Sequence, residues 1–315
     1  MTTAEKVDVV GVGLNATDIL IQVKDYPDRG SKVEIPSADA MLGGQVASAM
    51  VACQKWGLQT RYVGKFGEDH FAQLHRAEFV RCGVETHLFT APGCPSQQAY
   101  IVVDHTGERT ILWTRDGRIT LLPGELQREW IANAHVLHLD GHDTAAAALA
   151  AKWAREAGVP VVVDLDELYP GIEELLPNID FMITSRDIPE KLTGSGDLKT
   201  SLPEVFRRYE CQLAAATLGA QGVLAWDGKQ FHYAPAYQVK AVDTTGAGDT
   251  FHAGFIYGMR KGWRLQRRLE FACAAAALNC TKFGARGGIE PVEEIERFMA
   301  TAQRYPAEFE GATQP

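Results

Sequence analysis

The stretch Val239-Lys-Ala-Val-Asp-Thr-Thr-Gly-Ala-Gly-Asp-Thr-Phe-His-Ala-Gly-Phe255 combines the patterns of a strand, a glycine turn and the start of a helix. Apolar and polar side chains alternate over residues 237–242, which predicts a strand that ends at Asp243. From Thr250 onward, apolar and small residues recur at helical spacing, and Gly262 predicts the end of that helix. Between the two elements, the turn from Gly246 to Gly248 can point several backbone N–H groups in one direction. Such a turn before a helix is a favourable site for an anion, most often phosphate.

Asp249 directly follows this turn, and a carboxylate next to a bound phosphate indicates a reaction of that phosphate group. Phosphoryl transfer needs neutralised phosphate oxygens and a base for the attacking hydroxyl group. Asp249 is therefore the candidate base, and the amides of Gly246, Ala247 and Gly248 are the candidate anion hole. The structural alternative is a plain strand-to-helix turn, in which Asp249 only complements the helix dipole.

Composition limits the other classes of function. The chain has 315 residues, 46% of them hydrophobic and 23% charged, which suits one large globular domain with a sizeable core. A net charge of −9 argues against DNA or RNA as the main partner, but not against a nucleotide in a local pocket. The cysteines form no C-x-x-C pair, so neither a zinc site nor a disulfide framework is predicted. A signal-peptide layout and a membrane-spanning apolar run are both lacking, which predicts a cytoplasmic protein that does not bind a membrane.

Short apolar runs that alternate with helical patterns predict an α/β fold. Runs of this kind are typical of a mostly parallel sheet that is covered by helices on both faces, and they occur at residues 7–12, 135–139, 159–164, 179–184 and 212–218. Helices are expected at residues 45–56, 68–81, 143–157 and 265–283 and from residue 291 onward. In such sheets ligands bind beyond the carboxyl ends of the strands, where Asp140, Asp164 and Asp166 fall.

Several segments do not fit this alternation and predict a second, smaller sheet. Residues 98–103 and 109–114 are typical of a hairpin around residues 104–108. Together with residues 19–23 and 32–35 they predict a lid, formed by about 16–38 and 97–116 within a single domain of residues 1–315, over a site that must exclude water. The exposed edge of a lid sheet favours pairing with a second copy, so a homodimer through the lid is expected.

Gly11 and Gly13 are spaced as in a dinucleotide-binding fingerprint. That fingerprint needs a helix directly after the glycines, whereas residues 19–24 alternate as a strand does. The interpretation of the chain as a dehydrogenase would therefore be supported by these two glycines alone.

The stretch from Asp243 to Phe255 resembles the signature D-T-T-G-A-G-D-x-F of the ribokinase-like (PfkB) carbohydrate kinases, and the likeness runs over nearly the whole chain. Residues 43–49, GGQVASA, resemble the family's first signature, G-G-x-x-A-N-x-A, which lines the sugar site. The resemblance implies a ribokinase-like three-layer fold and an ATP-dependent kinase that phosphorylates a hydroxymethyl group of a small sugar. By the same resemblance the sugar would be bound by Asp18, Gly43, Gly44, Ser48 and Asp249, with Ser48 in place of the family's asparagine.

The resemblance also implies sites for the nucleotide and for cations. Residues 217–222 resemble the family's nucleotide loop, and residues 271–277 resemble the helix beside adenine. The implied ATP contacts are Thr217, Gly219, Gly222, Ser185, Gly248 and Cys273, the last standing where Asn or His is common. Relatives bind a monovalent cation such as K⁺ at the positions of Asp243, Thr245, Asn279, Lys282, Gly284 and Gly288. For Asp243, a carboxylate that only ties its own turn together is an equally good interpretation.

One departure from the family concerns the implied Mg²⁺. Ser185 and Ile188 stand where the family often has the asparagine and glutamate of N-x-x-E, so Asp187, Asp164 or Asp166 would have to supply oxygen ligands.

The remaining departures leave the acceptor open. The serine at 48 and a D-x-D pattern after a core strand resemble the branch that contains sulfofructose kinases. Near the predicted lid, three arginines could meet an anion or could be solvated surface residues, namely Arg109, Arg115 and Arg118. A kinase for nucleosides or for phosphorylated or sulfonated sugars, and a non-catalytic relative that binds sugar or nucleotide, are therefore alternatives.

Overall fold

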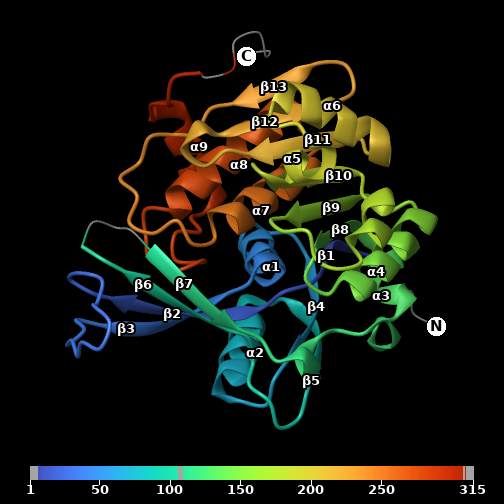
Figure 1. The fold of residues 1–315 in the computed structure, drawn as a ribbon. Helices are drawn as coiled ribbons and strands as arrows, with labels where there is room; N and C mark the ends of the chain where they lie inside the picture. The colour runs from blue at the N-terminus through green and yellow to red at the C-terminus, as the bar shows by residue number, and fades with distance from the viewer. Residues whose placement is uncertain (1–5, 106–108, 308, 310–315) are drawn as a thin grey trace.

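The computed structural model describes residues 6–105, 109–307 and 309 (Figure 1). Within these residues a nine-stranded sheet has the order β13-β12-β11-β10-β9-β8-β1-β4-β5. The strands from β11 to β5 are parallel, and β12 and β13 are antiparallel at one edge. The bounds are β1 (Val7–Val12), β4 (Thr60–Phe66), β5 (Glu85–Thr90), β8 (Ala134–Asp140), β9 (Val161–Leu165), β10 (Phe181–Ser185), β11 (Leu213–Thr217), β12 (Val223–Trp226) and β13 (Phe231–Ala234).

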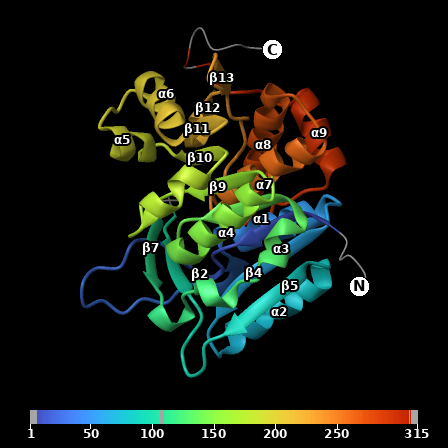
Figure 2. The ribbon, with the colours of Figure 1, turned by 90° about the vertical axis from the view of Figure 1, so that its right-hand side faces the viewer.

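Helices cover both faces of this sheet, which confirms the three-layer α/β fold (Figure 2). One face carries α1 (Gln45–Lys55), α2 (His70–Cys82), α7 (Ala247–Arg260), α8 (Leu265–Asn279) and α9 (Val292–Thr301). The other face carries α3 (Arg128–Ala132), α4 (Thr144–Glu156), α5 (Ile188–Thr193) and α6 (Leu198–Tyr209). A separate apolar cluster fills each interface, and successive strand residues such as Val9 and Val10 belong to opposite clusters. This two-sided burial explains why the strands are continuous apolar runs.

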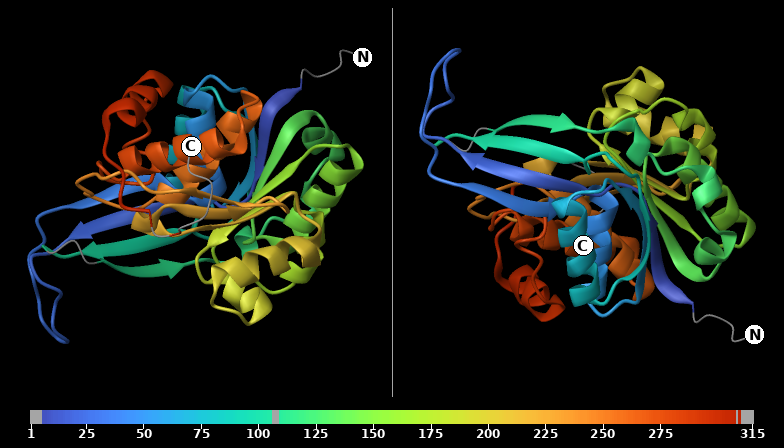
Figure 3. Two further views of the ribbon diagram at one scale, coloured as in Figure 1. Left: turned by 90° about the horizontal axis from the view of Figure 1, so that it is seen from above. Right: turned by 90° about the horizontal axis from the view of Figure 1, so that it is seen from below.

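A four-stranded sheet in the order β3-β2-β6-β7 extends away from the body of the molecule (Figure 3). Its strands are β2 (Ala16–Gln22), β3 (Ala38–Gly43), β6 (Gln98–Val103) and β7 (Arg109–Thr114). The predicted small sheet is thus confirmed, except that residues 32–35 form no strand. β3 takes that place because it pairs with β2 from Ala38 onward and leads directly into α1. Residues 106–108 of the predicted hairpin turn lie outside the described residues.

Three further expectations, for residues 237–242 and for the bounds of α7 and α8, need correction. Residues 237–242 form no strand: beyond β13 the chain makes only an isolated bridge between Tyr237 and Arg304. Pro235 follows β13 directly and cannot donate to a ladder, so the chain leaves the sheet there. α7 begins at Ala247, earlier than Thr250, and α8 ends at Asn279, short of residue 283.

The segment after Gly13 agrees with the sequence pattern, whereas two strands of the large sheet were not predicted. After Gly13 the chain enters β2 and not a helix, as expected, so the fold does not form a dinucleotide fingerprint there. Strands β4 and β5 were not predicted, although both belong to the parallel part of the large sheet. No helix in the described part of the chain is long and apolar enough to cross a bilayer.

Candidate active site

The turn before α7 presents backbone amides at the carboxyl edge of the large sheet. Gly246 has a φ of 73°, and a Cβ there would lie 2.3 Å from the carbonyl oxygen of Ala285, so only glycine fits. Outside its own helix, a Cβ at Gly248 would meet nothing nearer than a carboxylate oxygen of Asp164, at 4.0 Å. The backbone is therefore open to a ligand at this point. Because the first amides of a helix have no partner within it, this opening is suited to an anion.

Asp249 lies in the first turn of α7, and its side chain is buried. Burial, and secondly the charge of Asp164, raise the pKa of the Asp249 carboxyl group to about 8. A hydrogen bond with the Ser48 side chain acts in the opposite direction because it stabilises the ionised form. A carboxyl group that titrates near neutral pH is well suited to exchange a proton with a hydroxyl group.

Ser48, in α1, connects Asp249 to the buried side chain of Arg286. The Arg286 guanidinium donates from Nε to Ser48 Oγ at 3.1 Å and from an amino group to the Gly43 carbonyl oxygen at 2.8 Å, and it also pairs with Glu78. Because a guanidinium can only donate, Ser48 accepts from it, and the hydroxyl proton of Ser48 is available to the Asp249 carboxylate. Ser48 therefore orients Asp249, which the resemblance to a sugar-binding signature did not predict.

Asp18 faces the same site from the small sheet. It lies in β2 opposite Met41 of β3, and an oxygen of its carboxyl group fills the space that a side chain at Gly43 would need. Burial raises the pKa of Asp18 to about 7, while the charge of Arg286 lowers it. Asp18 and Asp249 also interact electrostatically, so the two carboxyl groups share one site.

Gly44 connects β3 to α1 and places Ser48 in this site. Its φ is 95°, and a Cβ there would lie 2.4 Å from the Cα atom of Asn15, so a side chain is excluded. The residues that the resemblance assigned to the sugar are therefore together in the fold: Asp18, Gly43, Gly44, Ser48 and Asp249.

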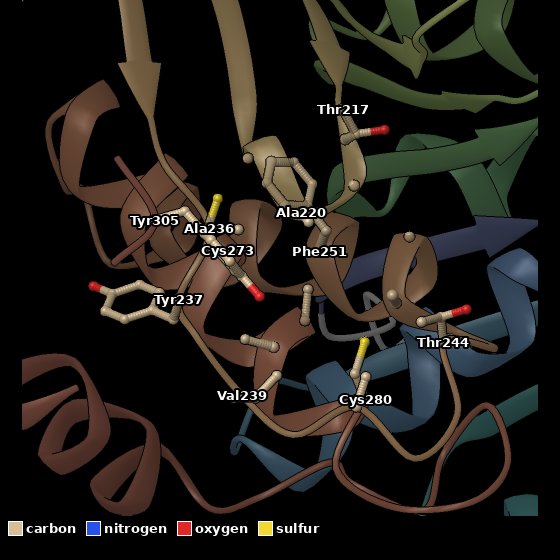
Figure 4. Close-up of a pocket in the computed structure, with 17 residues that line it drawn as sticks. Thr217, Ala220, Ala236, Tyr237, Val239, Thr244, Phe251, Cys273, Cys280 and Tyr305 are labelled. Carbon is tan, nitrogen blue, oxygen red and sulfur yellow. The ribbon is translucent and has the colours of Figure 1, made fainter. Parts of the chain in front are cut away.

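A cavity of about 240 Å³ lies on the other side of the glycine turn (Figure 4). Its lining is largely apolar and includes five of the six residues expected to contact ATP, namely Thr217, Gly219, Gly222, Gly248 and Cys273. Ser185 does not line the cavity but ends β10, beside Thr217 of β11.

Other residues of this cavity were not predicted from the sequence. They include Ala236, Tyr237, Phe251, Cys280 and Tyr305. Figure 4 shows Tyr305, Ala236 and Cys273 on one side of the cavity and Thr217 and Thr244 on the other. Tyr305 follows α9 in the chain and is held there by its backbone N–H, which donates to the Ala236 carbonyl oxygen at 2.9 Å. No periodic pattern marks this residue in the sequence.

Carboxylates lie at the ends of neighbouring strands, as predicted. The Asp140 carboxylate accepts from the backbone N–H groups of Leu14 at 2.6 Å and His142 at 3.0 Å. Burial, and then the charge of Asp166, raise the pKa of Asp164 well above its usual value. Asp187 instead pairs with Lys191 at 2.8 Å. Among the described residues, no group of three or more His, Cys, Asp or Glu side chains is placed to hold a metal ion, so Mg²⁺ would need phosphate and water ligands as well.

The residues assigned to a monovalent cation are brought together behind the glycine turn. The Asp243 carboxylate accepts from Thr245 N at 2.9 Å, Thr245 Oγ1 at 2.7 Å and Gly284 N at 2.8 Å. Asp243 thus ties its own turn together, as one of the two interpretations expected. Lys282 is half exposed, and its ammonium group pairs with Glu290 at 2.6 Å.

The arginines near the small sheet differ in their surroundings. Arg115 follows β7, is largely buried and pairs with Asp143 at the start of α4, so it links the small sheet to the body. Arg118 is exposed and pairs with Asp116 at 2.6 Å. The side chain of Arg109 lies outside the described part of the chain.

The chain is similar to carbohydrate kinases in sequence and in structure. A family model described as pfkB family carbohydrate kinase matches residues 8–291. A ribokinase of Lactococcus lactis is 26% identical over 299 residues, which cover 90% of this chain and 94% of that protein. A provisionally assigned ribokinase from Agrobacterium tumefaciens has a solved structure that is 30% identical, with a TM-score of 0.87 over 94% of this chain and 98% of that one. The ribokinase of Arabidopsis thaliana complexed with ribose and ATP is 25% identical, with a TM-score of 0.79 over 94% and 99% of the two chains.

Proposed function

The chain belongs to the pfkB family of carbohydrate kinases, and on this premise we propose that it transfers the terminal phosphoryl group of ATP to a hydroxymethyl group of a small sugar. The observation that supports this most strongly is the position of Asp249. Its buried carboxyl group lies next to the open backbone at Gly248 and shares a site with Asp18 of the small sheet.

Asp249 accepts the proton of the attacking hydroxyl group as the bond to phosphorus forms. The amides of Gly246, Ala247 and Gly248 stabilise the negative charge on the transferring group. ATP occupies the cavity with its triphosphate at Gly248 and its base beside Cys273 and Tyr305. The side chain of Asp249 then lies on the acceptor side of the turn.

The sugar is held by Asp18, the Gly43–Gly44 backbone and Ser48, and the small sheet is the lid that excludes water during transfer. Ribose is the first acceptor to test, because a solved relative is complexed with ribose and ATP. Mg²⁺, when bound, neutralises the nucleotide phosphates. Asp164 and Asp166 would hold it through water molecules, since Asp187 is paired with Lys191.

The small sheet also supports the expected homodimer. β7 is at its edge and exposes Ile111, Leu112 and Trp113, a contiguous apolar strand that a second copy would cover. Light scattering on the intact protein, compared with a Trp113→Lys variant, tests this assembly. A monomer at micromolar concentration would contradict it.

A panel of acceptors tests the proposed reaction. ADP release is measured with ATP and each of ribose, other free sugars, nucleosides, phosphorylated sugars and sulfonated sugars. We expect the highest kcat/KM with a free sugar that carries a hydroxymethyl group. A preference for a nucleoside or an anionic sugar would change the acceptor class, and ADP release with none of them would favour a binding protein without turnover.

A further inference from the structure

Asn279, the last residue of α8, is one of the residues expected to hold a monovalent cation, and its side chain is fully buried. Its side-chain N–H groups donate to the carbonyl oxygen of Thr245 at 3.1 Å and to that of Ala285 at 3.2 Å. Its Oδ1 atom accepts from Gly288 N at 3.1 Å. One amide group therefore ties the glycine turn to the loop that follows α8.

The hydrogen-bond network determines the orientation of this amide. If oxygen and nitrogen were exchanged, Oδ1 would face two carbonyl oxygens, and the NH₂ group would face the N–H of Gly288. Both contacts would be repulsive, so only the described orientation is compatible with the neighbours.

The two carbonyl oxygens that face Asn279 are the kind of ligand that a hard monovalent cation requires. Here they already receive hydrogen bonds from the partly positive NH₂ group, which lies within 3.2 Å of both. The carboxylate of Asp243 is likewise occupied by three donors of the chain itself. The Asp243 carboxylate and the Thr245 and Ala285 carbonyl oxygens thus already accept hydrogen bonds from the chain itself, and a K⁺ ion among them would meet the partly positive NH₂ group of Asn279. These groups therefore do not fit a bound K⁺ ion.

The surrounding packing leaves little freedom for the loop to rearrange. A Cβ at Gly288 would lie 2.5 Å from the Cα atom of Asn279, and one at Gly246 would lie 2.3 Å from the Ala285 carbonyl oxygen. The turn that presents the anion-binding amides is therefore packed directly against the segment that Asn279 holds.

We infer that the amide of Asn279 takes the place of the monovalent cation expected at this loop, so that the anion-binding turn is braced without K⁺. The inference rests on the proposed kinase function for its kinetic consequence, but its structural part is independent of turnover. Stabilisation of the turn by the Asn279 side-chain amide does not require an ion to lose its hydration shell. It also does not depend on the salt concentration.

The first test compares the wild-type protein in potassium chloride and in choline chloride at equal ionic strength. ATP is supplied as its Tris salt, and ADP is quantified directly by chromatography, so that no coupling enzyme adds its own salt dependence. We expect initial rates within twofold of each other and an equal Tm in the two salts. A saturable activation by K⁺ of about tenfold or more, or a Tm raised specifically by K⁺, would overturn the inference.

The second test uses Asn279→Ala, which frees both carbonyl oxygens and leaves room for an ion. We expect a rate at least tenfold below wild type in choline chloride, partial recovery in potassium chloride, and a Tm that K⁺ raises. Asn178→Ala is the matched control, because the Asn178 amide donates to Glu174 O in an exposed segment away from the glycine turn. A variant as active as wild type in both salts would contradict the inference.

The two tests keep the two proposals distinguishable. Absence of ADP release by the wild-type protein in every salt would reject the proposed function, and the Tm comparison would still decide the role of Asn279. The wild-type comparison also stands if Asn279→Ala does not fold.

Discussion

The two sides of the glycine turn are built from opposite chemistry. The nucleotide cavity is lined largely by glycine, alanine and other apolar residues, whereas the acceptor side contains Asp18, Ser48, Asp249 and Arg286, all of them buried. An apolar cavity binds by shape and by many weak contacts, so that no single side chain dominates. Buried charged groups depend on specific partners, and removing one leaves the others unsatisfied. Substitutions should therefore cost more on the acceptor side than in the cavity.

The largest effect is expected for Asp249→Asn. An amide cannot accept the hydroxyl proton, so kcat should fall by about 10²–10⁴-fold, while the affinity for ADP measured by calorimetry stays close to that of wild type. Asp25→Asn, at an exposed carboxylate, is the control. Equal turnover in Asp249→Asn would remove this residue from the mechanism.

Asp18→Asn should have the next largest effect, and only on the acceptor. A hydrogen bond to a charged group contributes about 1.5–3 kcal/mol, so the KM for the sugar should rise about 10- to 100-fold with the KM for ATP unchanged. Steady-state kinetics with each substrate varied in turn measures both constants. An equal rise in the two constants would mean that the acceptor and nucleotide sides are not separate.

The pH dependence of kcat/KM tests the link between Ser48 and Asp249. Asp249 must be ionised to accept a proton, and its pKa is raised to about 8, so activity should increase with pH and level off above about pH 8. The hydrogen bond with Ser48 lowers this pKa, so Ser48→Ala should move the rise to higher pH and reduce activity at pH 7 by about tenfold. Ser31→Ala, in an exposed turn, should leave the profile unchanged. An unshifted profile in Ser48→Ala would show that Ser48 does not influence the base.

The smallest effect is expected in the cavity. Tyr305→Ala removes one aromatic side chain from the wall of the cavity. Because a single aromatic contact contributes little binding free energy, the KM for ATP should rise only about three- to tenfold, with kcat unchanged. Tyr305→Phe keeps the ring and should behave as wild type. If Tyr305→Ala raised the KM for ATP as much as Asp18→Asn raises the KM for the sugar, the expected difference between the nucleotide cavity and the acceptor side would be wrong.

The features that follow from local pattern were predictable. The strands at the core of the sheet are continuous apolar runs because both of their faces are buried, and this pattern is visible without coordinates. The glycine turn and Asp249 are contiguous in the chain, so their proximity needs no tertiary information. The small sheet was predicted in part: β2, β6 and β7 alternate clearly, but β3 is defined by its pairing with β2 and by its connection to α1.

Residues that act through distant partners were not predictable in the same way. Arg286 lies far along the chain from Gly43 and Ser48, and its role depends on the loop after α8 packing against β3 and α1, which only the fold brings about. Tyr305 reaches the cavity because residues 236–238 leave the sheet after β13 and contact the segment after α9. The pattern over residues 237–242 predicted a strand because alternation alone does not show whether a neighbouring strand is present to pair with.

The amino-acid sequence by itself determined the layered α/β architecture, the anion-binding turn and the acid beside it, because each depends on residues that are close together in the chain. Only the tertiary structure decided which groups face that turn. Asn279 and Asp243 each hydrogen-bond both to Thr245 and to the loop after α8, and Ser48 directs its hydroxyl group to Asp249. Hydrogen-bond direction and burial are properties of three-dimensional packing and not of residue order.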